Sequence, residues 1–564
     1  MVHNVTSAGR LLDVLPLFHN DFRVQLLVTS TGSSAFQAGV GELFAELELP
    51  VLPWAQALST PVDLAISASF GGELPRIQGK LSVLSHGVGY TKKLARPGAG
   101  SREPGAGSRE PGAGSREPTF GLSPEWLLVD GKPFVDGLVL SHPEQVARLR
   151  RVCPEAVEAA VVAGDPCFDR MLAAHTHRDR FRRALGVRRG QRLVVLNSTW
   201  NPEGLFGSGD RDILPGLLPR LAAELPADDY RLAAVLHPNI WYGHGPGQVR
   251  AWLDDACRAG LTLIDPVRGW RQAVLAADAV VGDFGAVSFY AAALDVPVLM
   301  AADGRGRLDP ETPLASFVRH APRLDSHGPL REQVQHLLAG EHGRPDAASG
   351  VTSVPRASAR LLRRHFYRLM SLPEPAAPAL LEPLPLPAYD PPRRTAPLRV
   401  RTQVDGVDVR IERSAVSPYG APGDTHVAVH EDTRDPAALP VADLITRDGA
   451  PDDPRLGGWR GWSADVVRGY PQCGMAVFVT GPHTCAVRTR EGALFRLSAD
   501  TVTDADTGAD LDPAAYASSL YAWLSSGGRV PPAGVRLRVH AAGGVHPVYV
   551  EPVTPRPHSA TGER

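Results

Sequence analysis

The sequence predicts an α/β protein with two successive parallel-sheet halves, followed by a smaller α+β domain. Up to about residue 370, short runs rich in Val, Leu and Ile alternate with helical patterns, which is typical of βαβ units and a parallel sheet. The alternation restarts after residue 187, which indicates a second sheet. From residue 398 onward, polar and apolar residues alternate instead, which favours antiparallel strands.

Length and composition narrow the class of protein. At 564 residues the chain is too long for one core, and 43% hydrophobic with 21% charged residues is ordinary for a soluble globular protein. A net charge of -2 gives no global attraction to nucleic acid. The five cysteines are widely spaced without a CxxC pair, which fits a reducing cytoplasm. No apolar run approaches a membrane span, and the first residues lack the apolar core of a signal peptide. We expect a cytoplasmic protein that at most touches the inner face of the membrane peripherally.

Residues 1–166 form the expected first half. A helix begins near Thr6 or Ser7, either of which can cap it, and carries one apolar face. Only residues 1–3 remain for a strand before it, so that strand is very short or the start codon lies upstream. The expected strands are RVQLLVTS, LPVLPW, DLAISASF, LSVLSHG, GLVLSH and AAVVAGDP.

A seven-residue unit, PGAGSRE, occurs three times within residues 97–118. It contains no apolar residue larger than alanine, so it cannot bury a core of its own. We expect a flexible surface loop without a catalytic role, whose only effect would be on access to the neighbouring site.

Residues 167–371 form the expected second half. A long polar helix over residues 167–187 opens it, and the last helix is RASARLLRRHFYRLM. The expected strands are RLVVLNSTWN, RLAAVLHPNIW, LTLIDPV, AVVGDFGAV and PVLMAA. A proline-rich extended linker, 372–397, follows. The α+β domain, of unknown role, spans 398–554 and includes an amphipathic helix with Tyr516, Leu520, Trp523 and Leu524 on one face; 555–564 is an expected disordered tail.

Polar residues stand where several predicted strands end. Ligands of open parallel sheets bind at the carboxyl ends of strands. Taken singly, a His or Asp at such a place is commonly a cap or turn residue, so only their combination points to a site. The strand-end residues are His86, His142, Asp165, Asn197, Ser198, Thr199, His237 and Asp283.

The order of five motifs resembles the CDP-glycerol glycerophosphotransferase family, the teichoic-acid polymerases and primases. The motifs are SHGVGYTKK, AGDPCFDRML, VVLNSTWN, VLHPN and LAADAVVGDFGAVSFYAAALDVPVLM. The resemblance covers roughly Val5 to Met370 and leaves the C-terminal domain unmatched. It implies a GT-B arrangement of the two halves and a transferase of cell-wall or other cell-envelope polymer synthesis.

On the first half, the resemblance makes His86 the catalytic base that deprotonates the acceptor hydroxyl. An unperturbed histidine titrates near pH 6.5, close to working pH, which suits this role. Gly87 would let the acceptor and the backbone approach closely. Lys92 or Lys93 would meet an anionic acceptor.

On the second half, the turn that opens the helix VSFYAAALDV would hold the diphosphate of a nucleotide donor by its N–H groups and dipole, without a metal ion. The family has two serines where this chain has Gly285 and Ala286, so two side-chain donors are missing. The candidate donor contacts are His237, Asp283, Gly285, Ala286, Ser288, Ser198 and Thr199.

Alternatives from different classes stay open. The enzyme would transfer a glycerophosphate or glycosyl group from a CDP- or UDP-linked donor to a hydroxyl or polymer acceptor, with no cofactor. The missing serines leave room for a nucleotide- or glycan-binding protein without turnover, and a sugar-nucleotide epimerase shares the fold. A purine-nucleotide switch or translation GTPase is excluded, because the nearest segment to its phosphate-binding motif, LPRIQGKL, lacks the first glycine and the final hydroxyl residue. No nucleic-acid partner is expected.

Overall fold

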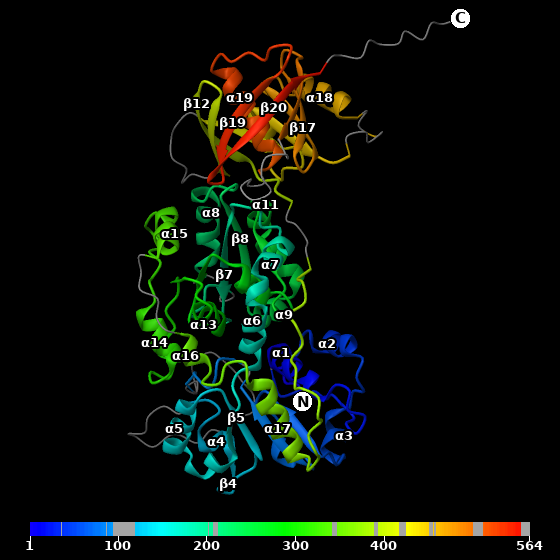
Figure 1. Cartoon of the computed structure of the whole chain (residues 1–564), viewed down its shortest axis with the longest axis vertical. Helices are drawn as coiled ribbons and strands as arrows, with labels where there is room; N and C mark the ends of the chain where they lie inside the picture. The colour runs from blue at the N-terminus through cyan, green and yellow to red at the C-terminus, as the bar shows by residue number, and fades with distance from the viewer. Residues whose placement is uncertain are drawn as a thin grey trace, which may run out of the picture.

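The structure is a computed structural model of the chain. It describes residues 1–34, 36–85, 87–93, 119–200, 202–206, 212–340, 347–388, 393–416, 425–450, 455, 458–499 and 511–553. Three bodies lie in a row: the first half at the bottom of Figure 1, the second half in the middle and the C-terminal domain at the top. The expected repeat loop at 97–118 and the tail at 555–564 lie outside the described residues.

The first half contains a four-stranded parallel sheet in the order β1-β2-β5-β6. Val83 of β2 and Leu138 of β5, both fully buried, belong to one apolar core with Leu127 of α4. The strands are β1 Leu64–Ser67, β2 Lys80–Leu84, β5 Gly137–Leu140 and β6 Ala160–Val162, with a small hairpin of β3 Leu128–Val129 and β4 Lys132–Pro133.

The segments predicted as strands before β1 form only isolated β-bridges. Parallel bridges join Val2 to Ser30 and Val28 to Val51. The strands expected at 23–30 and 49–54 are therefore wrong as full strands. Pro50 and Pro53 lie within the second segment and lack the amide N–H groups that a ladder needs.

The first helix of the first half begins earlier in the chain than the sequence predicted. Helix α1 begins after Asn4, not at Thr6 or Ser7. The Asn4 side chain accepts from the Ser7 amide at 2.9 Å, and the Ser7 hydroxyl accepts from the Asn4 amide, so the two residues form a capping box. The helices are α1 Val5–Val14, α2 Val40–Leu47, α3 Trp54–Ser59, α4 Pro124–Leu127 and α5 Pro143–Val152.

Helix α17, Ser358–Leu369, also belongs to the first half, although it follows the second half in sequence. Phe366 is fully buried and stacks on Phe18 with ring centroids 5.7 Å apart, in a core shared with Leu84 and Val139. The expectation that residues 167–371 all pack in the second half is thus corrected. The chain returns to the first half because the apolar face of α17 is buried there.

The second half contains a five-stranded parallel sheet in the order β11-β10-β7-β8-β9. Its strands are β7 Arg192–Ser198, β8 Tyr230–Leu236, β9 Thr262–Ile264, β10 Ala279–Gly282 and β11 Val298–Met300. They lie in the five predicted segments, and the prediction of two Rossmann-like parallel sheets is confirmed. The strand order reverses between β7 and β10, which makes their carboxyl ends the switch point of the sheet.

Helices cover both faces of this sheet (Figure 1). The expected long helix at 167–187 is interrupted by a 3-10 turn over His175–His177, which separates α6 from α7. The helices are α6 Pro166–Ala174, α7 Arg178–Ala184, α8 Leu214–Glu224, α9 Pro238–His244, α10 Pro246–Trp252, α11 Asp254–Arg258, α12 Trp270–Ala276, α13 Ala286–Ala293, α14 Pro313–His320, α15 Leu330–Ala339 and α16 Ala348–Val351.

The proline-rich segment after α17 runs along the second half toward the C-terminal domain (Figure 1). Gln272 of α12 donates to the Pro385 carbonyl oxygen at 2.9 Å, and Leu384 is buried in the second-half core. Residues 372–388 contain no helix or strand, and these contacts hold the segment against the second half.

The C-terminal domain is a closed barrel in the order β12-β13-β19-β20-β18-β17-β16-β15-β14. The prediction of antiparallel strands is only partly right, because β13–β19, β14–β15 and β15–β16 pair in parallel. The strands are β12 Leu398–Asp405, β13 Asp408–Ala415, β14 Thr425–His430, β15 Leu444–Asp448, β16 Met475–Gly481, β17 Thr484–Thr489, β18 Leu494–Ala499, β19 Val535–Ala541 and β20 Gly544–Pro552.

Helix α19, Pro513–Ser525, shares one core with the inward-facing residues of this barrel. Ala515, Ser519 and Leu520 are fully buried, so the helix is covered around most of its circumference. The sequence predicted one apolar face that includes Tyr516 and Leu520, but the buried surface of the helix is wider than that face. A second helix, α18 Gly458–Gly469, packs outside the barrel through Trp462.

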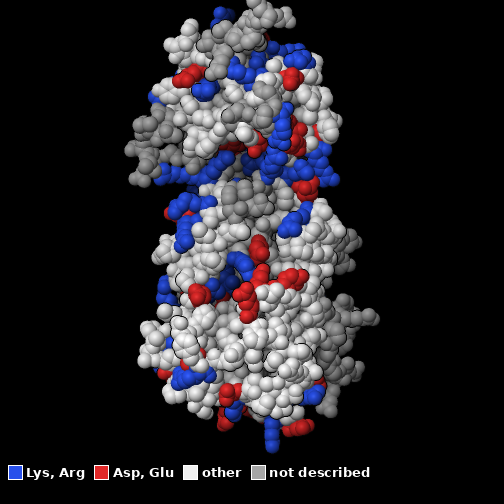
Figure 2. All heavy atoms as spheres, turned by 90° about the vertical axis from the view of Figure 1, so that its right-hand side faces the viewer, with Lys and Arg blue, Asp and Glu red and all other residues white. Residues whose placement is uncertain are grey.

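The barrel rests on the second half at the end of the sheet opposite its switch point. Arg413 of β13 donates to Asp228 at 2.6 Å and 2.8 Å, and the Ala227 amide donates to the Arg413 carbonyl oxygen at 2.7 Å. Lys and Arg side chains gather in a band at this junction (Figure 2). Among the described residues, no helix has both the length and the apolar character needed to cross a bilayer.

Candidate functional site

A cavity of about 480 Å3 lies between the two halves. Ser69 and Ser85, which follow β1 and β2, line it from the first half. Thr199, His237 and Gly285, which follow β7, β8 and β10, line it from the second. The carboxyl ends of both sheets therefore open into one shared space, which is the place where parallel sheets bind ligands.

Asp283 ties the two strand ends of the second-half switch point together. Its carboxylate accepts from the Thr199 amide at 2.6 Å and from the Gly285 amide at 2.9 Å. The side chain is fully buried and does not line the cavity. Burial raises its pKa to about 6, against the lowering effect of these amides and of the Lys92 charge. Asp283 thus shapes the turn, whereas Gly285 and Ala286 face the cavity.

Helix α13 begins at this turn. Gly285 is its N-cap residue with extended backbone, and it offers no side chain to cap the first N–H groups. Ala286, the first helical residue, lines the cavity. The positive end of the helix dipole is therefore directed at the shared space.

The hydroxyls of the candidate residues Ser288 and Ser198 form hydrogen bonds within the second half. Ser288 is fully buried and donates to the Asn197 side chain at 3.1 Å, so it does not replace the missing serines at the cavity wall. The Ser198 hydroxyl accepts from the amides of Leu205 and Phe206 at 3.0 Å and 2.9 Å. It lines the cavity but also holds the loop that follows β7.

His237 presents a defined tautomer. Its Nδ1 accepts from the Asn239 amide at 3.1 Å in the N-cap of α9. Because an amide can only donate, the neutral ring carries its proton on Nε2 and can donate there. The centroid of its ring lies 6.5 Å from that of Trp200. The Trp200 ring in turn meets the Phe36 ring of the first half edge-on, with centroids 5.1 Å apart. An aromatic contact thus crosses the cleft beside His237.

The first-half loop after β2 approaches the start of α13. A Cβ atom on Gly87 would lie 4.0 Å from the Cβ of Ala286. Lys92 and Lys93 line the same cavity, and the Lys93 amide donates to the Arg307 carbonyl oxygen at 2.9 Å. His86, the expected catalytic base, lies outside the described residues; its neighbours Ser85 and Gly87 line the cavity.

A buried polar network behind this loop was not found from the sequence. Arg10 of α1 pairs with Asp165 at 2.5 Å and donates to the Gly87 carbonyl oxygen at 3.0 Å and to the Tyr290 hydroxyl at 2.9 Å. Tyr290, on α13, donates to Asp165 at 2.6 Å. The network links both halves, and Arg10 and Tyr290 line the cavity. The sequence marks Asp165 only as a strand-end residue and gives no signal for Arg10 on an apolar helix.

His3, which follows the isolated bridge at Val2, also lines the cavity. Its ring nitrogens lie 3.0 Å from the Ser33 hydroxyl and 2.9 Å from the Ser67 hydroxyl. A very short strand at residues 1–3 was expected, but no motif indicated that His3 would reach the cleft.

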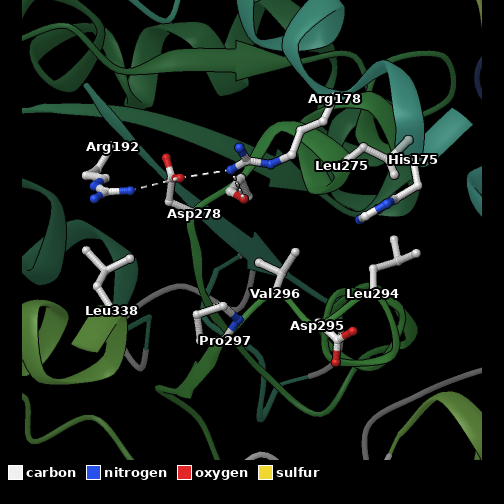
Figure 3. Close-up of a pocket in the computed structure, with 11 residues that line it drawn as sticks. His175, Arg178, Arg192, Leu275, Asp278, Leu294, Asp295, Val296, Pro297 and Leu338 are labelled. Atoms are coloured by element: carbon white, nitrogen blue, oxygen red, sulfur yellow. Dashed lines mark hydrogen bonds and ion pairs between the residues drawn. The ribbon is translucent and has the colours of Figure 1, made fainter. Parts of the chain in front are cut away.

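A second cavity, of about 290 Å3, lies at the opposite end of the second-half sheet (Figure 3). Asp278 accepts there from Arg178 at 2.8 Å, with Arg192 at 3.7 Å, while Arg182 contacts its other oxygen at 2.7 Å. Burial opposes ionisation, yet the arginines lower the pKa of Asp278. These contacts join α7 to the start of the sheet. Among the described residues, no group of three or more His, Cys, Asp or Glu side chains is arranged to hold a metal ion.

Comparisons with known proteins return matches among solved structures only. No protein-family model and no curated protein match the chain. A variant of the wall teichoic acid polymerase TagF is 14% identical, with a TM-score of 0.41, over 64% of this chain and 85% of that one. Anabaena HepE in complex with UDP-glucose is 13% identical, with a TM-score of 0.34, over 66% and 95%. Methanocaldococcus jannaschii UDP-GlcNAc 2-epimerase, in complex with UDP-GlcNAc and UDP, is 12% identical, with a TM-score of 0.40, over 64% and 97%.

Proposed function

We propose that the protein is a GT-B-type transferase that moves a glycerophosphate or glycosyl group from a nucleotide-diphosphate donor to a hydroxyl acceptor, in cell-envelope polymer synthesis. The observation that carries the proposal is the single cavity into which the carboxyl ends of both parallel sheets open. A transferase needs two substrates in one dry space, and two facing sheets supply a separate wall for each.

The second half would hold the donor. The N–H groups at Gly285 and Ala286 and the dipole of α13 would receive the diphosphate, and these groups do not depend on the missing serine side chains. Arg307, which lines the same cavity, would add positive charge, while Lys92 or Lys93 would meet an anionic acceptor. The Nε2–H of His237 would donate to a phosphate or ribose oxygen.

The first half would hold the acceptor and the base. We retain His86 as that base on the sequence pattern alone. It would take the proton of the acceptor hydroxyl while the acceptor oxygen bonds to the phosphorus or sugar carbon of the donor. The bond from that atom to the nucleotide breaks, and the nucleotide leaves with the electron pair. The approach of Gly87 to Ala286 supports this arrangement, because it brings the His86 segment to the donor turn.

The proposal includes a reaction without a metal ion, since the N–H groups and dipole of α13 and the charge of Arg307 would balance the diphosphate charge. CDP and UDP should raise the melting temperature of the full chain by several degrees when present far above Kd. Turnover of a CDP- or UDP-linked donor should continue in EDTA. Absence of a shift with any nucleoside diphosphate would contradict the proposal, and loss of turnover in EDTA would contradict its metal-free part.

His86→Ala should abolish turnover and keep the nucleotide-induced shift. His177→Ala, at an exposed histidine of the same chain, serves as the matched control and should keep both. A wild-type protein that shows the shift without turning over any donor would instead be a nucleotide-binding protein.

A further inference from the structure

A chain of hydrogen bonds runs through His3 at the first-half wall of the cavity. The Ser67 hydroxyl donates to the Ser69 carbonyl oxygen at 2.6 Å, and the Ser67 oxygen lies 2.9 Å from Nε2 of His3. The other ring nitrogen, Nδ1, lies 3.0 Å from the hydroxyl oxygens of both Ser33 and Thr31. These residues come from the start of the chain, the loop at 31–33 and the end of β1, so the fold brings them together.

The direction of these bonds gives His3 one tautomer. A carbonyl oxygen can only accept, so the Ser69 carbonyl takes up the single proton of the Ser67 hydroxyl. The Ser67 oxygen must therefore accept from Nε2, which carries the proton of the neutral ring. Nδ1 is left with a lone pair, and this lone pair accepts from a hydroxyl. His3 is thus oriented as a base toward Ser33 and Thr31, as a histidine is toward a serine nucleophile.

Ser33 is the hydroxyl residue of this pair that meets the cavity. Ser33 is half-buried and lines the cavity, whereas Thr31 is 7% exposed and does not line it. The two hydroxyl oxygens lie 2.7 Å apart, and the Thr31 oxygen also accepts from the Ser33 amide at 3.3 Å. A proton can therefore pass from Ser33 to His3 directly or through Thr31. Either route leaves an unprotonated Ser33 oxygen at the cavity wall.

The backbone at Gly71 lies against the Ser33 hydroxyl. A Cβ atom on Gly71 would lie 2.6 Å from Oγ of Ser33 and 3.3 Å from Nδ1 of His3, so this approach requires glycine. Gly71 and Gly72 both line the cavity, and neither amide donates a hydrogen bond within the part of the chain that the structure describes. Backbone N–H groups beside a nucleophile are the groups that stabilise the negative charge on a carbonyl oxygen under attack.

The groups around the Ser33 hydroxyl favour a neutral substrate. Among the described residues, the Ser33 side chain forms hydrogen bonds with His3 and Thr31 only, and neither the neutral ring nor the hydroxyl carries a charge. The neighbouring cavity residues Asn4 and Ser34 are also neutral, and the Asn4 side chain donates to the Ser34 hydroxyl at 3.4 Å. Transfer of a phosphoryl group needs cations around its oxygens, whereas an ester carbonyl is uncharged before attack.

We propose that Ser33 and His3 form an esterase site for a small neutral carboxylic ester. The Ser33 oxygen bonds to the carbonyl carbon while His3 takes the hydroxyl proton. The bond from that carbon to the alcohol oxygen then breaks, and the alcohol leaves with the proton from His3. Water attacks the acyl-serine in the same way and releases the carboxylic acid, which restores Ser33. The residues of this site all belong to the first half, and the reaction is independent of the proposed transfer.

A fluorophosphonate tests the site on the full wild-type chain, because an activated serine bonds to its phosphorus and displaces fluoride. Mass spectrometry of the digested protein should find the adduct on Ser33. The folded chain should also hydrolyse p-nitrophenyl acetate, with release of p-nitrophenolate, and heat denaturation should abolish both reactions. Absence of an adduct on Ser33 would overturn the proposal, and this result requires no variant.

Ser33→Ala and His3→Gln should each lower kcat/KM for p-nitrophenyl acetate by at least about 100-fold, with a cooperative melting curve retained. Gly71→Ala should also slow the reaction, because its Cβ would displace the Ser33 hydroxyl. Ser59→Ala, at an exposed serine of α3, is the matched control and should keep the wild-type rate. Hydrolysis at the wild-type rate in Ser33→Ala would refute the nucleophile. Labelling of Ser33 at the wild-type rate in His3→Gln would refute the base.

Discussion

Asp283 shows at the residue scale how a strand-end carboxylate can shape a site without touching its ligand. Its two oxygens each accept from a backbone amide, one at the end of β7 and one before α13. The carboxylate therefore fixes the distance between the two strand ends that flank the switch point. Its burial is what separates its role from that of Gly285 and Ala286, which line the cavity.

Asp283→Asn should change how stability depends on pH. Folding raises this pKa from 3.8 to about 6, so the folded state binds more protons than the unfolded chain between these values. The wild type therefore loses stability as pH rises through this window, by about 3 kcal/mol in all, and the loss is complete above it. The melting temperature of the variant, relative to wild type, should rise between about pH 4 and about pH 7.

The same titration on Asp255→Asn, at a side chain that is 89% exposed, gives the control. Its difference from wild type should stay flat over this range. A flat difference for Asp283→Asn as well would contradict a raised pKa at the switch point.

At the scale of elements, α17 connects the two halves by returning to the first. Its buried side includes Leu362 and Phe366, which pack in the core of β2 and β5. His365 of the same helix lies 3.1 Å from the Ser82 hydroxyl of β2, and burial lowers its pKa to about 4. The helix is thus an integral layer of the first half.

Phe366→Ala should destabilise the first half by about 3–5 kcal/mol, because it leaves a cavity beside Phe18. Hydrogen exchange should rise for the amides of β2 and β5 and stay unchanged for those of β7 and β8. Arg364→Ala, at an exposed position of α17, should leave both sets unchanged. Equal loss of protection in the two sheets would contradict the assignment of α17 to the first half.

At the scale of the whole molecule, the barrel is fixed to the second half through a buried ion pair. Arg413 is 1% exposed and contacts Asp228 of the second half and Asp512, the N-cap residue of α19. Arg331 of α15 also pairs with Glu412 at 2.8 Å. One arginine therefore secures both the helix inside the barrel and the barrel on its neighbour.

Asp228→Ala should loosen this junction by about 3 kcal/mol, because Arg413 loses its second-half partner while buried. Since Asp512 still pairs with Arg413, the barrel itself should stay folded. Small-angle scattering should show a larger radius of gyration, and hydrogen exchange should rise in α8 and β13. Asp255→Ala, at an exposed partner of Arg434 near the same junction, should change neither. An unchanged radius and exchange pattern for Asp228→Ala would show that other contacts hold the barrel.

Local patterns sufficed for the second half. Its strands are short apolar runs bounded by polar residues and turns, and they form where the sequence predicts them. The same patterns predicted that polar residues after β7, β8 and β10 would stand at one edge, and Thr199, His237 and Gly285 do line one cavity. These patterns did not show that Asp283 is buried while the neighbouring Gly285 and Ala286 line the cavity, because burial depends on what packs around a turn.

The sequence by itself determined the two parallel sheets and the residues at their carboxyl ends, since strand and helix periods are local properties of the chain. Only the tertiary structure decided that α17 returns to the first half and that α19 is enclosed by the barrel. It also decided that the ring of Phe70 packs against the rings of Tyr90 and Trp126. These contacts join segments far apart in the chain. No local period encodes such pairs, because their formation depends on which buried surfaces fit together in the folded molecule.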